Sequence, residues 1–180
     1  MQVRHLILDR DGVLLAEDEG GGYLTRAADL RWLPGARQAL AAFHAAGLRV
    51  SVATNQSAVG RGLMTGEALE AVHDRLRRDA AAAGGRIDAI LSCPHAPEDG
   101  CDCRKPLPGL LLEAMRLAGL PAAQTLVVGD DLRDLEAARA AGVKAVLVRT
   151  GKGARVEGSA GAAGVDVFDD LAAVAGRFAA

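Results

Sequence analysis

The sequence predicts an α/β protein built on a doubly wound parallel sheet. Short apolar runs alternate with segments whose apolar residues recur at helical spacing. Several of the runs end in acidic or polar residues, and the length of 180 residues corresponds to one domain. Strands and helices that alternate in this way form right-handed βαβ units, which build a parallel sheet. We therefore expect a single domain over residues 1–180, with ligands at the carboxyl ends of its strands.

The order of the expected elements follows from apolar periodicity and from Gly and Pro at the boundaries. Pro34 in a first turn and Gly47 after a last turn frame one helix, and Thr65 is suited to N-cap the next. Expected strands cover residues 3–8, 49–53, 87–92, 125–128 and 144–148. Expected helices cover residues 34–46, 65–83, 109–118, 132–141 and 170–178. Stretches 93–108 and 151–164 are expected to be irregular, and the Gly-rich segment 19–33 to form at most a flap.

The composition excludes several classes of partner. The net charge is −2, from 21 basic and 23 acidic residues, and aromatic residues make up 3 % of the chain. Neither a basic surface for nucleic acid nor a polybasic patch for membranes is present. No apolar run reaches the roughly 18–20 residues of a membrane span, and the first residues lack a signal-peptide pattern. We expect a cytoplasmic protein with a small-molecule partner; a monomer is slightly favoured, although the sequence does not define the oligomeric state.

Two carboxylates mark the end of the first expected strand. Asp9 and Asp11 stand two residues apart, so in extended backbone both side chains point the same way. Carboxylates that lie so close together repel each other unless a cation joins them, and their pKa values tend to separate. One then stays ionised as a nucleophile or metal ligand while the other can carry a proton. The alternative interpretation is a solvated turn with two surface aspartates.

Further polar residues follow two other expected strands and the irregular stretch. Asp130 and Asp131 end the strand at 125–128, and Asp134 comes four residues after Asp130. Such oxygen-rich groups suit Mg²⁺, although Asp131 or Asp134 would also cap the next helix while Asp130 faces the metal. Thr54 and Lys105 would supply a hydroxyl and a cation to a phosphate held between the strand ends.

The three cysteines cluster within eleven residues around one histidine. Cys93, His95, Cys101 and Cys103 together offer three thiolates and an imidazole, the ligand set of a closed tetrahedral zinc site. With four protein ligands no position remains for water, so the zinc is expected to be structural. It would order the loop 93–103 and direct the residues that follow it toward the phosphate. A free-thiol or redox cluster is the alternative, but no Cys-x-x-Cys is present.

Taken together, these motifs resemble a known family along nearly the whole chain. The motifs are Asp9-Arg10-Asp11-Gly12, Thr54-Asn55-Gln56-Ser57, Cys93-Pro94-His95, Cys101-Asp102-Cys103-Arg104-Lys105-Pro106 and Gly129-Asp130. In this order they resemble the haloacid dehalogenase-like (HAD) phosphatases. The resemblance is closer to the zinc-containing branch, which holds heptose 1,7-bisphosphate and histidinol phosphatases.

The resemblance implies a role for each motif. Asp9 would attack phosphorus and form an aspartyl-phosphate, and Asp11 would act as general acid and then as general base. Mg²⁺ would be held by the Asp9 carboxylate, the Asp11 backbone carbonyl and Asp130. Zn²⁺ would be structural. Substrate contacts would come from six residues: Thr54, Asn55, Gln56, Ser57, Arg104 and Lys105.

Two observations point to different substrates within this branch. Segments 54–62 and 148–152 are similar to the heptose bisphosphate phosphatases. The spacing between His95 and Cys101 is similar to that of histidinol phosphatases, and Asp131 stands where heptose enzymes often carry Lys. We expect removal of the 7-phosphate of D-glycero-D-manno-heptose 1,7-bisphosphate. Histidinol phosphate or another small phosphomonoester is the alternative.

Two classes of non-enzymatic protein are the alternatives to a phosphatase. A phospho-signalling receiver domain also uses a doubly wound sheet, acidic residues and Mg²⁺, but it carries its acceptor aspartate after a later strand, where this chain has Ala53 and Thr54. A receiver domain also has no need of a Cys₃His loop. A pure zinc interaction module would leave Asp9, Asp11 and Asp130 unexplained.

Overall fold

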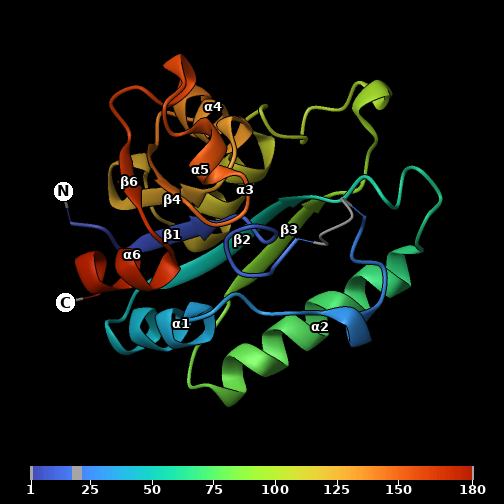
Figure 1. Cartoon of the computed structure of the whole chain (residues 1–180), viewed down its shortest axis with the longest axis horizontal. Coiled ribbons are helices and arrows are strands. Elements are labelled where there is room, and N and C mark those ends of the chain that lie inside the picture. Colours follow the sequence, from blue (N-terminus) through green and yellow to red (C-terminus); the bar gives the residue numbers. More distant parts are fainter. Residues whose placement is uncertain (1, 18–21, 180) are drawn as a thin grey trace.

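The computed structural model describes residues 2–17 and 22–179, and within them six strands form one sheet (Figure 1). The strands are β1 (His5–Leu8), β2 (Arg49–Asn55), β3 (Ala89–Cys93), β4 (Thr125–Gly129), β5 (Lys144–Val148) and β6 (Asp166–Phe168). They lie in the order β3-β2-β1-β4-β5-β6, and all neighbours pair in parallel. The predicted doubly wound α/β fold is confirmed.

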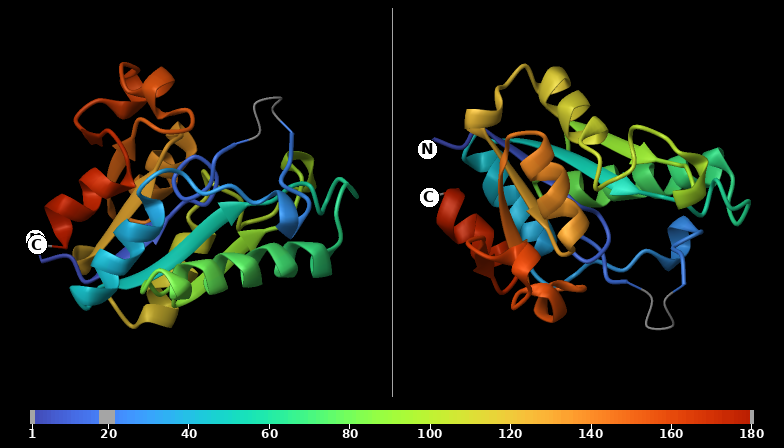
Figure 2. Two further views of the ribbon diagram at one scale, coloured as in Figure 1. Left: turned by 60° about the horizontal axis from the view of Figure 1, so that its bottom comes forward. Right: turned by 90° about the horizontal axis from the view of Figure 1, so that it is seen from above.

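Helices cover both faces of the sheet (Figure 2). They are α1 (Ala36–Ala45), α2 (Gly66–Ala82), α3 (Gly109–Ala118), α4 (Leu132–Ala140), α5 (Gly153–Val156) and α6 (Leu171–Phe178). α1, α2 and α6 pack on one face, and α3 and α4 on the other. As predicted, the Thr65 side chain caps α2, because its hydroxyl accepts a hydrogen bond of 3.1 Å from the Ala68 amide. Within the described part of the chain no helix is both long and apolar enough to cross a bilayer.

The alternation of side chains along the strands divides the core into two layers. In β1, Leu6 and Leu8 belong to the cluster under α1, α2 and α6, whereas Ile7 belongs to the cluster under α3 and α4. All three side chains are almost completely buried. Burying a side chain of this size stabilises a fold by about 1.5–3 kcal/mol. β1 is therefore held from both faces, which fixes the position of the residues that follow it.

The strand order places a topological switch between β1 and β4. The chain leaves β1 toward β2 on one side, and β4 pairs with β1 on the other. At such a switch the connections diverge and leave a crevice beyond the carboxyl ends of the two strands. Asp9 and Asp130 are the residues that directly follow β1 and β4. The topology therefore brings the two predicted acidic motifs together.

Some local predictions are corrected by the structure. The stretch 151–164 contains the short helix α5, and it is followed by the strand β6, which was not predicted. β6 has three residues at the sheet edge, too few for a recognisable period-two pattern. β2 extends through Asn55, because this end of the strand pairs with β3.

The structure tests only part of the flap expected at 19–33, because residues 19–21 lie outside the described residues. Residues 22–33 contain a 3-10 turn at Ala27–Asp29. Near the end of this segment the Trp32 indole donates a hydrogen bond of 2.9 Å to Asp79 on α2.

Candidate active site

Asp9 lies at the centre of the crevice, directly after β1. Its Oδ1 accepts a hydrogen bond of 2.7 Å from the Arg10 amide and lies 3.1 Å from Nζ of Lys105. Burial raises the pKa of Asp9 from 3.8 to about 7, against the opposing effect of Lys105, and nearby Asp134 and Asp11 add to the rise. A carboxyl in such surroundings favours a bound cation, because a cation would offset the cost of holding negative charge here.

Lys105 is a buried cation between two carboxylates. Its Nζ lies 2.5 Å from Asp134 Oδ1 as well as 3.1 Å from Asp9, and the side chain is 4 % exposed. Burial lowers its pKa, but Asp134 and Asp9 more than offset this and raise the pKa overall, so Lys105 remains charged. The Asn55 side chain fixes the backbone of Lys105, since its amide donates to the Lys105 carbonyl at 2.9 Å and accepts from the Lys105 amide at 3.0 Å.

Asp130 is enclosed by two glycines and a backbone amide. The Lys152 amide donates a hydrogen bond of 2.8 Å to its Oδ2. A β-carbon on Gly12 or on Gly151 would collide with this carboxylate, and both glycines have positive φ, 81° and 59°. Burial, followed by the charge of Asp9, raises the pKa of Asp130 to about 8. The loops after β1 and β5 thus close around this one side chain.

The start of α4 joins the same group of charges. Asp131 caps the helix by accepting from the Arg133 amide at 3.2 Å, and Asp134 accepts from the Asp131 amide at 3.2 Å. The expectation that these aspartates cap the helix is confirmed, but Asp134 also pairs with Lys105. Oxygens of Asp9, Asp130 and Asp134, hereafter the carboxylate cluster, lie within 4.8 Å of one another. The pairing of Asp134 with Lys105 was not predicted.

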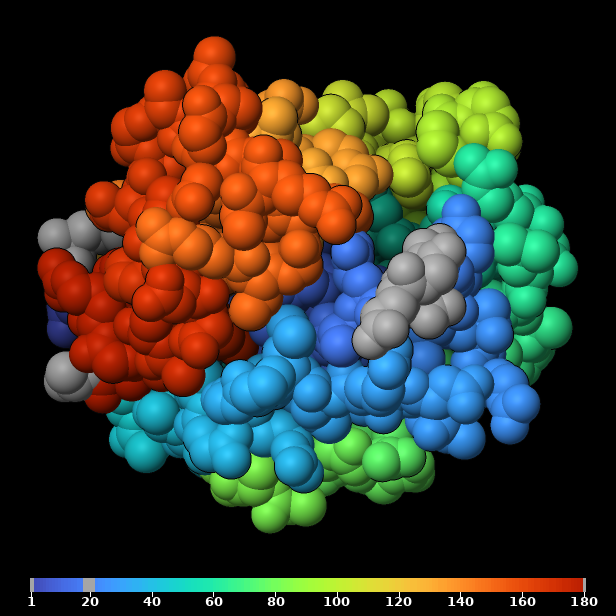
Figure 3. All heavy atoms as spheres, viewed as in Figure 1, coloured from blue at the N-terminus to red at the C-terminus, as the bar shows by residue number. Residues whose placement is uncertain are grey.

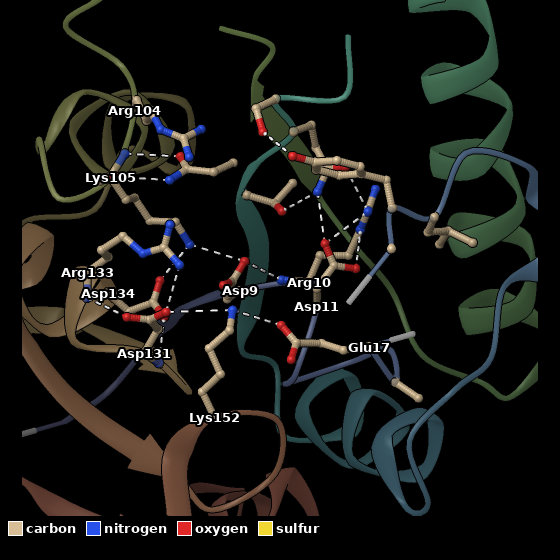
Figure 4. Close-up of a pocket in the computed structure, with 18 residues that line it drawn as sticks. Asp9, Arg10, Asp11, Glu17, Arg104, Lys105, Asp131, Arg133, Asp134 and Lys152 are labelled. Carbon is tan, nitrogen blue, oxygen red and sulfur yellow. Dashed lines mark hydrogen bonds and ion pairs between the residues drawn. The ribbon is translucent and has the colours of Figure 1, made fainter. Parts of the chain in front are cut away.

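Asp11 lines the same pocket as Asp9, but its carboxylate contacts different residues (Figure 4). The Arg10 guanidinium donates to both of its oxygens at 3.1 and 3.0 Å. The Gln56 amide donates to Oδ2 at 2.9 Å. The side chain is 31 % exposed, so it also faces the pocket.

The pocket around these residues has a volume of about 320 Å³. The surface is recessed where the orange, green and blue segments meet in Figure 3. Five acidic and five basic described residues line the pocket: Asp9, Asp11, Glu17, Asp131, Asp134, Arg10, Arg104, Lys105, Arg133 and Lys152. Because the charges balance, a bound divalent cation would make the pocket net positive, which suits a phosphate ester.

The lining residues that were not among the predicted site residues include Glu17, Tyr23, Arg133 and Lys152. Lys152 Nζ lies 2.8 Å from Glu17 and 3.6 Å from Asp131, and Arg133 pairs with Asp131 at 2.7 Å. Glu17, Tyr23 and Arg133 stand outside the motifs recognised in the sequence, whereas Lys152 ends the segment 148–152 but was not assigned to the site. Their place in the pocket depends on how distant loops fold over the strand ends.

The other predicted substrate contacts also line the pocket, but several are committed to neighbours. The Thr54 hydroxyl accepts from the Gln56 amide at 2.9 Å, and the Ser57 hydroxyl lies 3.4 Å from that of Tyr23. Arg104 donates to the His95 carbonyl at 3.3 Å. Of this set, Ser57 and Arg104 have the weakest protein contacts and are the freest to meet a ligand.

Cys93, His95, Cys101 and Cys103 converge as predicted, and we refer to them as the Cys/His cluster. The sulfurs of Cys93 and Cys103 each lie 3.6 Å from that of Cys101. His95 Nδ1 lies 3.6 Å from Cys93 and 3.4 Å from Cys103. Four such ligands placed tetrahedrally around zinc, at about 2.3 Å for sulfur and about 2.1 Å for nitrogen, would lie about 3.5–3.8 Å apart. The cluster therefore has the dimensions of a tetrahedral metal site.

Comparison with known proteins connects this geometry to a family. The HAD-hydrolase-like family model matches residues 102–174. A D-glycero-β-D-manno-heptose-1,7-bisphosphate 7-phosphatase of Pseudomonas aeruginosa is 46 % identical over 170 residues, which cover 94 % of either chain. The enzyme of the same name from Bordetella bronchiseptica is 45 % identical over 176 residues, with the same coverage. The chain belongs to the HAD-like phosphatases.

Solved structures extend the similarity from sequence to coordinates. The D,D-heptose 1,7-bisphosphate phosphatase of Bordetella bronchiseptica, complexed with magnesium and phosphate, matches this HAD-like phosphatase with a TM-score of 0.91 and 42 % identity over 97 % of both chains. The corresponding enzyme of Burkholderia thailandensis matches with a TM-score of 0.69 and 38 % identity, again over 97 % of both chains. The predicted family and enzyme class are confirmed.

Proposed function

We propose that this HAD-like phosphatase removes the 7-phosphate of D-glycero-β-D-manno-heptose 1,7-bisphosphate through an aspartyl-phosphate on Asp9. The observation that carries the proposal is the position of Asp9, at the end of β1 in a charged pocket and beside Lys105. The substrate is supported by relatives that bear this activity in their names and match this chain over 94 % of its length.

We propose that the carboxylate cluster and the Asp11 backbone carbonyl hold Mg²⁺. The raised pKa values of Asp9 and Asp130 support this, because both carboxyls are crowded with negative charge that a divalent cation would neutralise. A related structure contains magnesium and phosphate. Bound there, Mg²⁺ would offset the negative charge of the phosphoryl oxygens and of the attacking carboxylate. Lys105 lies closer to Asp134 than to Asp9, at 2.5 Å against 3.1 Å, so Asp9 and Asp130 are the primary carboxylate ligands in this proposal.

The proposed reaction has two steps, formation of the aspartyl-phosphate and its hydrolysis. A carboxylate oxygen of Asp9 attacks phosphorus, the bond from phosphorus to the ester oxygen breaks, and Asp11 gives its proton to the departing alkoxide. Asp11, now ionised, takes a proton from a water molecule whose oxygen attacks the phosphoryl group. The bond between phosphorus and Asp9 breaks, and inorganic phosphate leaves. Lys105 stabilises the charge on the phosphoryl oxygens throughout.

The second phosphate of a bisphosphate needs cationic partners of its own. Arg104, Arg133 and Lys152 line the pocket in addition to Lys105. Of these, Arg133 and Lys152 both contact Asp131, so a phosphate would compete with that carboxylate for them. We propose that Arg104, Ser57 and these two cations contact the substrate beyond the reacting phosphate, with Thr54, Asn55 and Gln56 supporting them.

We propose that the Cys/His cluster binds structural Zn²⁺. Its ligand set and spacing suit a closed tetrahedral site, as set out above, and apparent binding free energies of about 10–16 kcal/mol are typical of such sites. Arg104 and Lys105 directly follow Cys103, so ordering this loop also positions both cations. Reduced thiols are required, which fits the cytoplasm as the proposed place of action.

A comparison of two substrates tests the proposed function. We expect kcat/KM for heptose 1,7-bisphosphate to exceed that for histidinol phosphate by at least about 100-fold, a difference of about 2.7 kcal/mol in transition-state binding. Histidinol phosphate is the second candidate, because Asp131 adds negative charge to the pocket and favours a substrate with an amino group. Higher efficiency on histidinol phosphate would overturn the substrate assignment, and no phosphate release from either would overturn the function.

A further inference from the structure

Arg10, the residue between the two aspartates of the first motif, is buried and directed at Asp11. Its side chain is 1 % exposed. Nε donates to Asp11 Oδ1 at 3.1 Å, and Nη2 donates to Asp11 Oδ2 at 3.0 Å. Nη2 also donates to Gln56 Oε1 at 2.8 Å. The guanidinium thus binds both oxygens of one carboxylate in a bidentate, fork-like interaction.

Gln56 completes the ring of contacts from a second strand end. Its amide nitrogen donates to Asp11 Oδ2 at 2.9 Å and to the Thr54 hydroxyl at 2.9 Å. Gln56 follows β2 directly and is 4 % exposed. The Asp11 carboxylate is therefore held from the ends of both β1 and β2, two strands that pair in parallel.

Among the described residues, the hydrogen bonds leave one acceptor position on Asp11 open. An ionised carboxylate has about four lone-pair positions, two on each oxygen. Nη2 of Arg10 and Nε2 of Gln56 take the two positions on Oδ2, while Nε of Arg10 takes one on Oδ1. The remaining position belongs to Oδ1. Since the side chain is 31 % exposed and lines the pocket, this is the position from which it can exchange a proton with a ligand.

Stability does not account for this arrangement. Nη1 of Arg10 is buried and has no hydrogen-bond partner within the described residues, and the same holds for Nε2 of His73 on α2. Burial and the charge of Arg10 both lower the pKa of His73, which favours the neutral form of this nearby imidazole. Buried ion pairs contribute little net stability, and buried donors without partners cost free energy. A role in the reaction would account for a buried arginine at this position.

We propose that Arg10 is a positioning residue which, with Gln56, orients Asp11 so that its Oδ1 gives and takes the proton in both steps of the reaction. The inference rests on the proposed aspartyl-phosphate function. Arg10 itself does not contact the reacting atoms. Without the fork the Asp11 side chain rotates freely, and both protonation of the leaving group and activation of water become slower.

The test compares a substrate with a poor leaving group and one with a good leaving group. Heptose 1,7-bisphosphate releases an alkoxide, which needs a proton from Asp11. p-Nitrophenyl phosphate releases a stabilised phenolate, which leaves without one. In the variant Arg10→Met we expect kcat on the heptose substrate to fall about 100-fold, in the range of a lost general acid. With p-nitrophenyl phosphate we expect a rapid burst of nitrophenol stoichiometric with the enzyme, followed by slow turnover, because only the hydrolysis of the aspartyl-phosphate is impaired.

The outcomes separate the inference from the proposed function. If unsubstituted protein hydrolyses neither substrate, the proposed function fails. If the unsubstituted protein is active while Arg10→Met loses both substrates in equal proportion and shows no burst, Arg10 serves only the structure and the inference fails. Unchanged kinetics in Arg10→Met would overturn it as well.

Two further variants keep the test decisive if Arg10→Met does not fold. Gln56→Met leaves Arg10 in place but removes one contact to Asp11, and we expect a fall in kcat of about tenfold on the heptose substrate with the nitrophenol burst retained. Absence of this pattern overturns the inference. Arg75→Met is the matched control, because Arg75 pairs with Asp79 on α2 at 2.9 Å through both carboxylate oxygens and does not line the pocket. Its kinetics should equal those of the unsubstituted protein.

Discussion

The carboxylate cluster and the Cys/His cluster are held by different kinds of structure. Asp9 and Asp130 directly follow β1 and β4, which pair up to Leu8 and Val128, and the Asp9 amide donates to the Val128 carbonyl at 3.0 Å. The third carboxylate, Asp134, lies in the first turn of α4. In the Cys/His cluster only Cys93 belongs to a strand, the edge strand β3. The loop that carries its other three ligands has one 3-10 turn at Pro97–Asp99 as its regular structure.

Because the two clusters are held so differently, a bound metal would have a different role at each. At the carboxylate cluster the sheet already fixes the ligands, so a cation would contribute charge rather than shape. At the Cys/His cluster the loop has little regular structure of its own, so the metal would contribute shape. Loss of a carboxylate should therefore reduce activity with little effect on folding, whereas loss of a thiolate should affect both.

The largest effect is expected for Asp9→Asn. This change removes the proposed nucleophile but keeps the shape of the side chain, so kcat should fall by about 10⁴-fold or more while the melting temperature stays within a few degrees. Steady-state phosphate release and thermal unfolding measure the two effects. The control Asp74→Asn removes an exposed carboxylate of α2 that pairs with Arg77, and its kinetics should not change. Substantial activity in Asp9→Asn would contradict the assignment of the nucleophile.

Cys103→Ser should have the next largest effect, and on two properties together. It removes a proposed zinc ligand two residues before Lys105, so we expect near-stoichiometric zinc to be lost and the melting temperature to fall. We also expect kcat to fall by about 10–100-fold, as for other losses of groups that support a site. Elemental analysis, thermal unfolding and kinetics on one preparation check this. Full zinc content and full stability in the variant would remove this residue from the ligand set.

Arg133→Met tests a cation that lines the pocket beside the carboxylate cluster. Arg133 is paired with Asp131 and lines the pocket. If it contacts the second phosphate, the variant should raise KM for the bisphosphate about tenfold, equal to about 1.4 kcal/mol, with little change in kcat. Hydrolysis of a monophosphate such as p-nitrophenyl phosphate should be unaffected. An equal rise in KM for both substrates would show that Arg133 does not distinguish the second phosphate.

The smallest effect is a pH dependence of stability in the metal-free protein. Burial raises the pKa of Asp9 to about 7 and of Asp130 to about 8 in the folded state, from 3.8. The folded state therefore holds protons that the unfolded chain has already released, so these groups stabilise fully below about pH 4 and lose that contribution as the pH rises toward 8.

Mg²⁺ requires the ionised carboxylates and reverses this loss. The rise in melting temperature on adding Mg²⁺ should accordingly be larger at about pH 8.5 than at about pH 6. The difference should shrink in Asp130→Asn. A Mg²⁺ effect of equal size at both pH values in the unsubstituted protein would contradict the crowding of charge inferred here.

Sequence reasoning located the parts of the site that strand ends define. Asp9 and Asp130 could be placed because an apolar run followed by acidic residues shows where a strand stops, and parallel strands end at one edge. The Cys/His cluster was found because the three cysteines of this chain lie within eleven residues and His95 lies among them.

The remaining features depend on contacts between distant segments. Arg133 carries no local signal that separates it from an ordinary surface charge. Lys152 lies in the family-like segment 148–152, but that resemblance does not show that its side chain lines the pocket. Substrate binding by Asn55 stays a prediction, but the two hydrogen bonds by which its amide holds the backbone of Lys105 could not be predicted. β6 was missed because three edge residues carry too little pattern. In each case tertiary packing, not local sequence, decides the outcome.

The enclosure of Asp130 by Gly12 and Gly151 limits which amino-acid substitutions this chain can tolerate. The two glycines come from opposite ends of the sequence, yet a methyl group on either would collide with the same carboxylate. The two loops are also joined by the Thr150 hydroxyl, which donates to the Gly12 carbonyl at 2.6 Å. Substitution in one loop cannot be accommodated by movement of the other, so we expect both glycines to be retained or replaced only together with Asp130. In a library of random variants, we expect active proteins to keep positions 12, 130 and 151 unchanged or to change them together.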